Sequence, residues 1–143
     1  MAETVWHRHG IHGLAFSPDG STLASVSVDG TAALWDTRTR QRTADFWKAG
    51  FTGLQAVAFS PDGTRLAVGL LGGKAARLYD LRTRRELITL AAPDGVFYRV
   101  EFSPSGDALL CGASDGHCYQ WRPPSFAELD AARSTQGLAP EQP

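Results

Sequence analysis

Three histidines near the start of the chain are the first residues whose type and spacing suggest chemistry. His7, His9 and His12 lie close together, and imidazole is a common metal ligand. Successive positions of an extended segment point to opposite faces, however, and no Cys or carboxylate completes the spacing typical of a metal site. The sequence therefore predicts no metal centre, and it predicts no bound cofactor.

No other set of residues has the pattern of a catalytic site. No nucleophile stands beside a base, and no pair of carboxylates is spaced for acid–base work. The segment Gly72-Gly73-Lys74 lacks the long glycine-spaced loop, the following Ser or Thr and the helix of a phosphate loop, so it predicts a hairpin turn with one extra residue. We expect a protein that is not an enzyme.

Arginines gather at two places and are candidates for binding a partner. Each group follows an aromatic–Asp pair, so the two groups are expected in equivalent hairpins on the same rim of the molecule. Guanidinium groups there could bind the carboxylates or phosphates of an acidic partner in bidentate fashion, or they could simply keep two solvated turns soluble. The arginines are Arg38, Arg40, Arg42, Arg82, Arg84 and Arg85.

Apolar residues beside turns form a second candidate contact surface, on the opposite rim. Large apolar side chains that are exposed together mark contact surfaces, although each of these could equally be buried between neighbouring units. The residues are Val28, Leu70, Leu71, Phe51 and Tyr98.

Length and charge limit the classes of protein to consider. The 143 residues have a mass of 15.4 kDa, are 43% hydrophobic and 20% charged, and carry a net charge of −1. These values are typical of one soluble globular domain and give no positive field that would attract nucleic acid or an anionic membrane. We find no signal peptide and no membrane helix, and we expect Cys111 and Cys118 to be reduced, so the predicted location is the cytoplasm.

A repeat organises the whole chain. The sequence FSPDG occurs at 16–20 and again at 59–63, and FSPSG occurs at 102–106, so both intervals are 43 residues. A fixed period of this size indicates a repeat architecture. Short runs of Val, Leu, Ala and aromatic residues, bounded by Gly, Pro or Asp, predict strands joined by hairpins. Each unit is expected to be an antiparallel sheet of up to four strands, with fourth strands at 42–47 and 86–90.

The units resemble the blades of WD-repeat β-propellers. Trp35-Asp36 is the dipeptide that gives the family its name, and Tyr79-Asp80 and Trp121-Arg122 are variants of it. The resemblance implies an all-β partial propeller with blades at about 5–47, 48–90 and 91–122, the last of them incomplete. After Pro123-Pro124, a capping-box spacing predicts a short helix within 123–133, followed by a disordered tail at 134–143. This ending also resembles the tails of large bacterial WD-repeat regulatory proteins, some of which carry a kinase domain upstream.

The resemblance also implies a structural hydrogen-bond network in the first unit. In the family, a His before the first strand bonds an Asp of a later turn, and that Asp braces a Ser or Thr and the Trp. The implied members are His7, Asp29, Trp35 and either Ser25 or Ser27. The second unit has Gly50 and Gly72 at the matching places, and the third has Pro93 in place of the His.

A closed propeller typically has four to eight blades, so the three predicted here are too few to close one. The chain could be the last part of a longer propeller, it could close a ring by self-association, most simply as a dimer, or it could persist as an open arc. Residues 3–7 could supply the strand that the third blade lacks, by pairing with a neighbouring copy of the chain. We expect a non-catalytic scaffold whose partners are other proteins rather than nucleic acid or a membrane, with a self-assembling module as the alternative.

Overall fold

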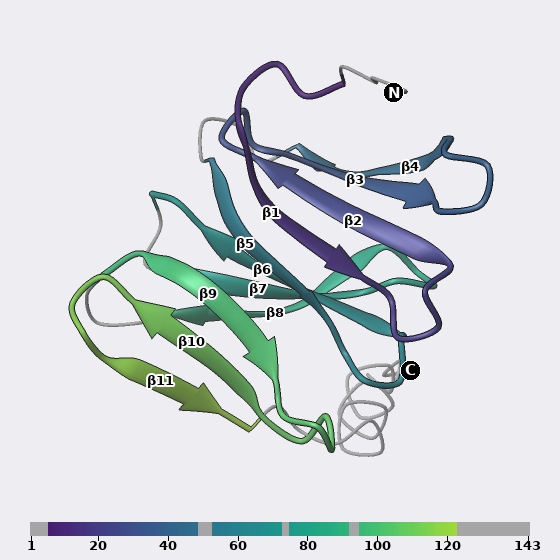
Figure 1. Ribbon diagram of the computed structural model, residues 1–143. Helices are drawn as coiled ribbons and strands as arrows, with labels where there is room; N and C mark the ends of the chain where they lie inside the picture. Colours follow the sequence, from purple (N-terminus) through teal and green to yellow (C-terminus); the bar gives the residue numbers. More distant parts are fainter. Residues whose placement is uncertain (1–5, 49–52, 73–74, 92–94, 123–143) are drawn as a thin grey trace, which may run out of the picture.

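The computed structural model describes residues 6–48, 53–72, 75–91 and 95–122, and in these ranges the chain is built from strands and turns without a helix (Figure 1). The strands form three separate antiparallel sheets, each following the order of the chain. The first sheet contains β1 (Ile11–Phe16), β2 (Thr22–Ser27), β3 (Thr31–Asp36) and β4 (Arg42–Lys48). The second contains β5 (Leu54–Phe59), β6 (Arg65–Leu70), β7 (Ala75–Asp80) and β8 (Arg85–Ala91). The third contains β9 (Phe97–Phe102), β10 (Leu109–Ala113) and β11 (Cys118–Trp121).

The repeated turn shows why this sequence folds into hairpins. The Ser17 hydroxyl donates to the Asp19 carboxylate at 2.6 Å and accepts the Thr22 N–H at 2.9 Å. Gly20 has a φ of 72°, a conformation that costs a glycine little. In the third unit Asp107 accepts the hydroxyl hydrogen bonds instead, because a serine stands at the usual Asp position. Local hydrogen bonds thus reverse the chain at the same point of every sheet.

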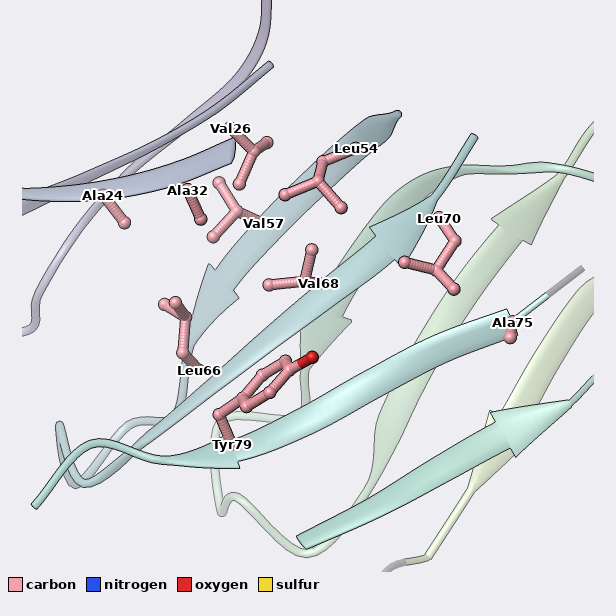
Figure 2. Close-up of a cluster of buried hydrophobic side chains, with 10 residues drawn as sticks. All are labelled: Ala24, Val26, Ala32, Leu54, Val57, Leu66, Val68, Leu70, Ala75 and Tyr79. Atoms are coloured by element: carbon pink, nitrogen blue, oxygen red, sulfur yellow. The ribbon is translucent and has the colours of Figure 1, made fainter. Parts of the chain in front are cut away.

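The three sheets pack against one another through their faces, and their first strands β1, β5 and β9 are neighbours (Figure 1). Two apolar layers hold the stack together. Figure 2 shows the layer between the first and second sheets, where Ala24, Val26 and Ala32 contact larger side chains such as Leu66 and Val68. The second layer joins the second sheet to the third and contains Leu78, Phe97 and Leu109, among others. The second sheet is therefore covered on both faces.

The predicted all-β class, the three sheets and the fourth strands of the first two sheets are confirmed. Within the described residues the third sheet has three strands, as expected for an incomplete blade. The predicted helix within 123–133 and the tail at 134–143 lie outside the described residues. Of the strand suggested at 3–7, only Trp6 and His7 are described, and neither is in a strand. In the described part of the chain, a search for helices able to span a membrane finds none.

Candidate interaction surfaces

The histidine network proposed for the first unit forms a directed chain of hydrogen bonds. The Thr31 hydroxyl donates to the Asp29 carboxylate, so Thr31 Oγ1 accepts from His7 Nδ1 at 2.8 Å. His7 Nε2 is then the acceptor of the neutral ring and receives the Ser25 hydroxyl proton at 2.7 Å. The Trp35 indole N–H donates to Ser25 Oγ at 2.9 Å. This series of hydrogen bonds therefore runs from an indole donor to a carboxylate acceptor, and each polar group in it has a partner.

Two features of this network differ from the arrangement implied by the family resemblance. His7 Nδ1 lies 3.8 Å from Asp29 Oδ1, and Thr31 bridges the two residues. Of the two serines considered, Ser25 is the link to the indole, whereas the Ser27 hydroxyl donates to a backbone carbonyl of Gly10 at 3.0 Å. Thr31 was missed by sequence reasoning, although its position two residues after Asp29 in a Gly-containing turn is a signal for a local side-chain bond.

Burial and hydrogen bonding set the ionisation of the network. Burial lowers the pKa of His7 below its ordinary 6.5, against the opposing effect of the Asp29 charge. Burial alone would raise the pKa of Asp29, but hydrogen bonds from Thr31 and from the Arg8 N–H outweigh it and lower the pKa to about 2. The network thus contains a neutral imidazole and an ionised carboxylate at neutral pH.

We predict that acid destabilises the protein in two steps. Because the folded-state pKa of His7 lies below 6.5, its contribution is complete above pH 6.5 and decreases as the pH falls below that value. The contribution of Asp29, roughly 2 kcal/mol, decreases between pH 3.8 and about 2. Urea unfolding measured from pH 7.5 to 5 checks the first step, and His7→Gln is the control that should lack it. Equal pH dependence in the two proteins would contradict the assignment to His7.

The two arginine turns have the same geometry, as the repeat predicts. Asp36 accepts the Thr39 N–H and Asp80 accepts the Thr83 N–H, each at 2.6 Å. The residue after each Thr adopts a left-handed conformation, with φ of 59° at Arg40 and 57° at Arg84. Exposed side chains follow at both turns, and all six arginines are exposed: Arg38, Arg40, Arg42, Arg82, Arg84 and Arg85.

Arg42 differs from the other arginines of its group. It lies in β4, forms an ion pair with Asp45, and places its guanidinium 3.8 Å from the centre of the Trp6 ring. A cation over an aromatic face is a favourable contact. Its charge therefore has two partners within the chain itself.

The rim that carries the arginines also carries acidic residues. Because strands alternate in direction, the turns that contain Asp19 and Asp62 lie at the same end of the sheets as the arginine turns. A hollow of about 360 Å³ between the first two sheets is lined by Asp19, Asp62 and Arg84 together with apolar side chains. This rim is of mixed charge, so it is no continuous basic patch.

The left-handed arginines lead to a stability prediction. An L side chain in this conformation costs about 1–2 kcal/mol, which glycine avoids at the expense of greater freedom in the unfolded chain. We expect Arg40→Gly and Arg84→Gly each to raise the free energy of unfolding by about 0.5–1 kcal/mol in urea titrations. Arg38→Gly and Arg82→Gly remove the same charge from positions of ordinary φ and should give no gain. A gain in all four variants would show that charge, rather than backbone conformation, is responsible.

The opposite rim exposes fewer apolar groups than the sequence suggested. Leu70 is 4% exposed and belongs to the layer between the first two sheets, so it is not part of the surface. Val28 and Leu71 are half-buried, and the Leu71 N–H donates to the Gly53 carbonyl at 2.8 Å. Tyr98 is 59% exposed at the start of β9. Phe51 lies outside the described residues.

The largest exposed apolar side chains lie instead on β1, where sequence reasoning did not place a contact surface. Ile11, Leu14 and Phe16 are 52%, 61% and 66% exposed. Leu14 and Phe16 also line a hollow of about 520 Å³ along the three first strands β1, β5 and β9. Across this hollow His12 Nδ1 donates to Gln55 Oε1 at 2.8 Å and ties the first two sheets together. These side chains are exposed because the first sheet lies at the end of the stack, where no described sheet covers its outer face.

The two cysteines are free, as expected from the sequence. Cys111 is opposite Tyr119 and Cys118 is opposite Gly112, so the thiols lie on opposite faces of the third sheet. Burial raises the pKa of Cys111 to about 12, with the nearby Cys118 adding to the effect. Among the described residues, no three His, Cys, Asp or Glu side chains are grouped so that they could hold a metal ion.

Three meandering sheets that stack through apolar faces, with a His–Ser–Trp chain in the first, define a repeat protein of propeller blades. Comparison with protein families agrees with this class. Residues 3–36 and 84–122 match the family described as WD domain, G-beta repeat, and together these segments cover half of the chain. The chain belongs to the WD-repeat family. No curated protein matches it in sequence.

The match omits the middle repeat, although β5 to β7 form a sheet like the others. This repeat has Gly50 and Gly72 where the first repeat has its His and Asp. Apolar packing on both faces therefore maintains the middle blade without the polar network. WD repeats generally serve as non-catalytic scaffolds for protein interactions, and this is the kind of function that the family supports.

Proposed function

We propose that this protein is a protein-interaction scaffold, a partial propeller that is completed by association with another protein. The observation that carries the proposal is the exposure of Leu14 and Phe16 on β1, at one end of the stack. Large apolar groups exposed together on a soluble domain mark an interaction surface. The rest of the chain supplies a rigid support, because the second sheet is buried between the other two.

The loops at the two ends of the sheets provide further positions for contact. The arginine turns present exposed guanidinium groups, and Tyr98 is exposed at the opposite rim. Loops on a rigid scaffold commonly carry binding residues, because they vary without disturbing the core. We assign these rims a secondary role, since their charges are mixed and their apolar residues are partly buried.

A second candidate is a homo-oligomer in which copies of this chain complete one another. It is favoured by the third sheet, whose edge strand β11 lacks a fourth strand among the described residues. A free edge can pair with a strand of another chain. A related possibility, based on the C-terminal tail, is that the chain is the final part of a larger regulatory protein.

Absolute mass in solution tests the proposal. We expect light scattering across a dilution series to show the 15.4 kDa chain at low concentration and heterogeneous association at high concentration, together with binding of an apolar dye. A discrete dimer would favour the homo-oligomer instead. A monodisperse species of 15.4 kDa that binds no dye at any concentration would overturn completion by association.

A further inference from the structure

The stack has two outer faces, one on the first sheet and one on the third, and they differ in chemistry. Because the sheets are repeats of one unit, each outer face can be compared with the equivalent face inside the stack. The 43-residue period relates Leu14 to Val57 and Phe16 to Phe59. Val57 is 9% exposed against the first sheet, whereas Leu14 is 61% exposed. The outer face of the first sheet is thus the same kind of face as the one that the second sheet buries.

This outer face carries large apolar side chains in register. Leu14 and Phe16 lie beside Ser25 and Leu23 of β2, and Leu23 lies beside Trp35 of β3. Alternate residues of a strand share a face, so these side chains all point away from the second sheet. The polar groups among them, Ser25 and the Trp35 N–H, already bond within the His7 network. His7 and Trp6 also cover this part of the face, since Ser25 is 2% exposed and the Trp6 ring contacts that of Trp35. The open part is the one that carries Leu14 and Phe16, and apolar atoms can cover it without leaving a polar group unpaired.

The outer face of the third sheet carries charged residues at two positions where the other sheets are small and apolar, and the half-buried Leu110 of β10 shares this face. Arg99 corresponds to Ala56 in the second repeat, and Glu101 corresponds to Ala58. Both charged residues are exposed and form an ion pair at 2.6 Å. Gln120, on the same sheet, is exposed as well. A polar outer face is typical of the terminal repeat of a stack, so this side is suited to solvent.

Inside the stack, each face of large side chains meets a face that is rich in alanine, although larger residues such as Val26 and Leu78 also lie on these faces. Leu66 and Val68 of the second sheet pack against Ala24 and Ala32 of the first (Figure 2). Phe97 and Leu109 of the third sheet likewise pack in one cluster with Ala67 and other residues of the second. Large against small is an arrangement that lets two layers interdigitate at native density.

We propose that the outer face of the first sheet docks a β-sheet of another polypeptide whose facing side chains are apolar and mostly small. This inference rests on the proposed function and specifies the face and the chemistry of the partner. It continues the interface between the first and second sheets by one further repeat. The part of the face that carries Leu14 and Phe16 is uncharged, and the Arg42–Asp45 ion pair lies at the far edge of the face, on β4. A partner face that is uncharged where it meets Leu14 and Phe16 is therefore favoured over a charged one, because burying an unpaired charge is costly.

A second copy of this chain fits the face less well. Head-to-tail association would place Leu14 and Phe16 against the face that carries Arg99 and Glu101. Face-to-face association would place large side chains against large side chains, unlike both interfaces in the stack. Neither arrangement provides the uncharged, alanine-rich surface found inside the molecule.

A tandem protein tests the docking face. Residues 6–52 are duplicated ahead of residue 6 of the natural chain, so the first copy offers Ala24, Val26 and Ala32 to the face that carries Phe16 in the second copy. The variant Phe16→Asp is made separately in each copy and in the natural chain, and urea unfolding midpoints are compared. We expect the second-copy substitution to shift the midpoint at least roughly three times as far as the others, because only that side chain becomes covered.

Matched controls separate docking from a general effect of charge. The first-copy Phe16→Asp keeps an open face, and Tyr98→Asp changes an equally exposed aromatic on the third sheet. Both should shift the midpoint little. Equal shifts at both copies of Phe16 would overturn the inference, and so would a discrete dimer of the natural chain that Phe16→Asp dissociates.

A labelled peptide of residues 22–36 provides a second measurement if the tandem protein does not fold. The peptide carries the small side chains of the first sheet, and we expect saturable binding to the natural chain that Phe16→Asp weakens at least about tenfold. Absence of binding would overturn the inference. Completion by association would survive that result, because the mass and dye-binding measurements test it without specifying which kind of sheet covers the face.

Discussion

Phe97→Ala is expected to lower the free energy of unfolding by about 3–5 kcal/mol. Phe97 is 0% exposed, and its ring lies edge-on to those of Trp121 and Tyr119, with centroids 5.5 and 5.8 Å apart. The loss combines the burial energy of the ring with the cost of the cavity left between the second and third sheets. The free energy of unfolding of a small domain is about 5–15 kcal/mol in total, so this substitution should greatly weaken the packing of the third sheet on the second.

The neighbouring residue supplies the control for this prediction. Tyr98 is also aromatic but is 59% exposed, and we expect Tyr98→Ala to change the free energy of unfolding by no more than about 0.5 kcal/mol. Guanidinium or urea titration, read by far-ultraviolet circular dichroism, measures both variants. Similar losses in the two variants would contradict the placement of Phe97 between the sheets.

Ser25→Ala is expected to cost about 2–4 kcal/mol, the second-largest effect among these variants. The Ser25 hydroxyl is buried and serves both His7 and Trp35, so its removal leaves the imidazole without a donor and the indole without an acceptor. An unsatisfied buried polar group costs about 1–3 kcal/mol, and two such groups are created. Urea titration at pH 7.5, where His7 is neutral, gives the relevant comparison.

A double-mutant cycle separates the two losses. Trp35→Phe removes the indole N–H, so the added Ser25→Ala should cost less in that background than in the natural chain. Ser105→Ala, at an exposed turn, should be near neutral or cost only the loss of a surface hydrogen bond. An equal cost of Ser25→Ala with and without the indole N–H would contradict the bond between Ser25 and Trp35.

Hairpins and strands could be predicted because their causes are local. The turn at Ser17-Pro18-Asp19-Gly20 is held by hydrogen bonds within a few residues, and the same letters recur at a fixed interval. The grouping of His7 with Ser25 and Trp35 came from the family resemblance. The bridging role of Thr31 depends on how His7, near the start of the chain, meets the first residue of β3, which no local pattern encodes.

The interaction surface could not be predicted because identical patterns have different surroundings. Phe16 and Phe59 occupy the same place in the same motif, yet Phe16 is exposed whereas Phe59 packs against the layer between the first two sheets. Alternation identifies which side chains share a face, but it does not say whether another sheet covers that face. Leu70 and Leu71 illustrate the same limit, since one is buried and its neighbour is half-buried.

All residues of strand β6 are buried, and this determines the order in which the sheets can unfold. Every sheet is a meander whose contacts are local in sequence, so a single sheet can separate without unthreading the rest. Separation of the first or the third sheet breaks one apolar layer, whereas opening of the second breaks both. Sub-global unfolding therefore begins at the ends of the chain, and amides of β6 exchange with solvent only when cooperative unfolding reaches the centre.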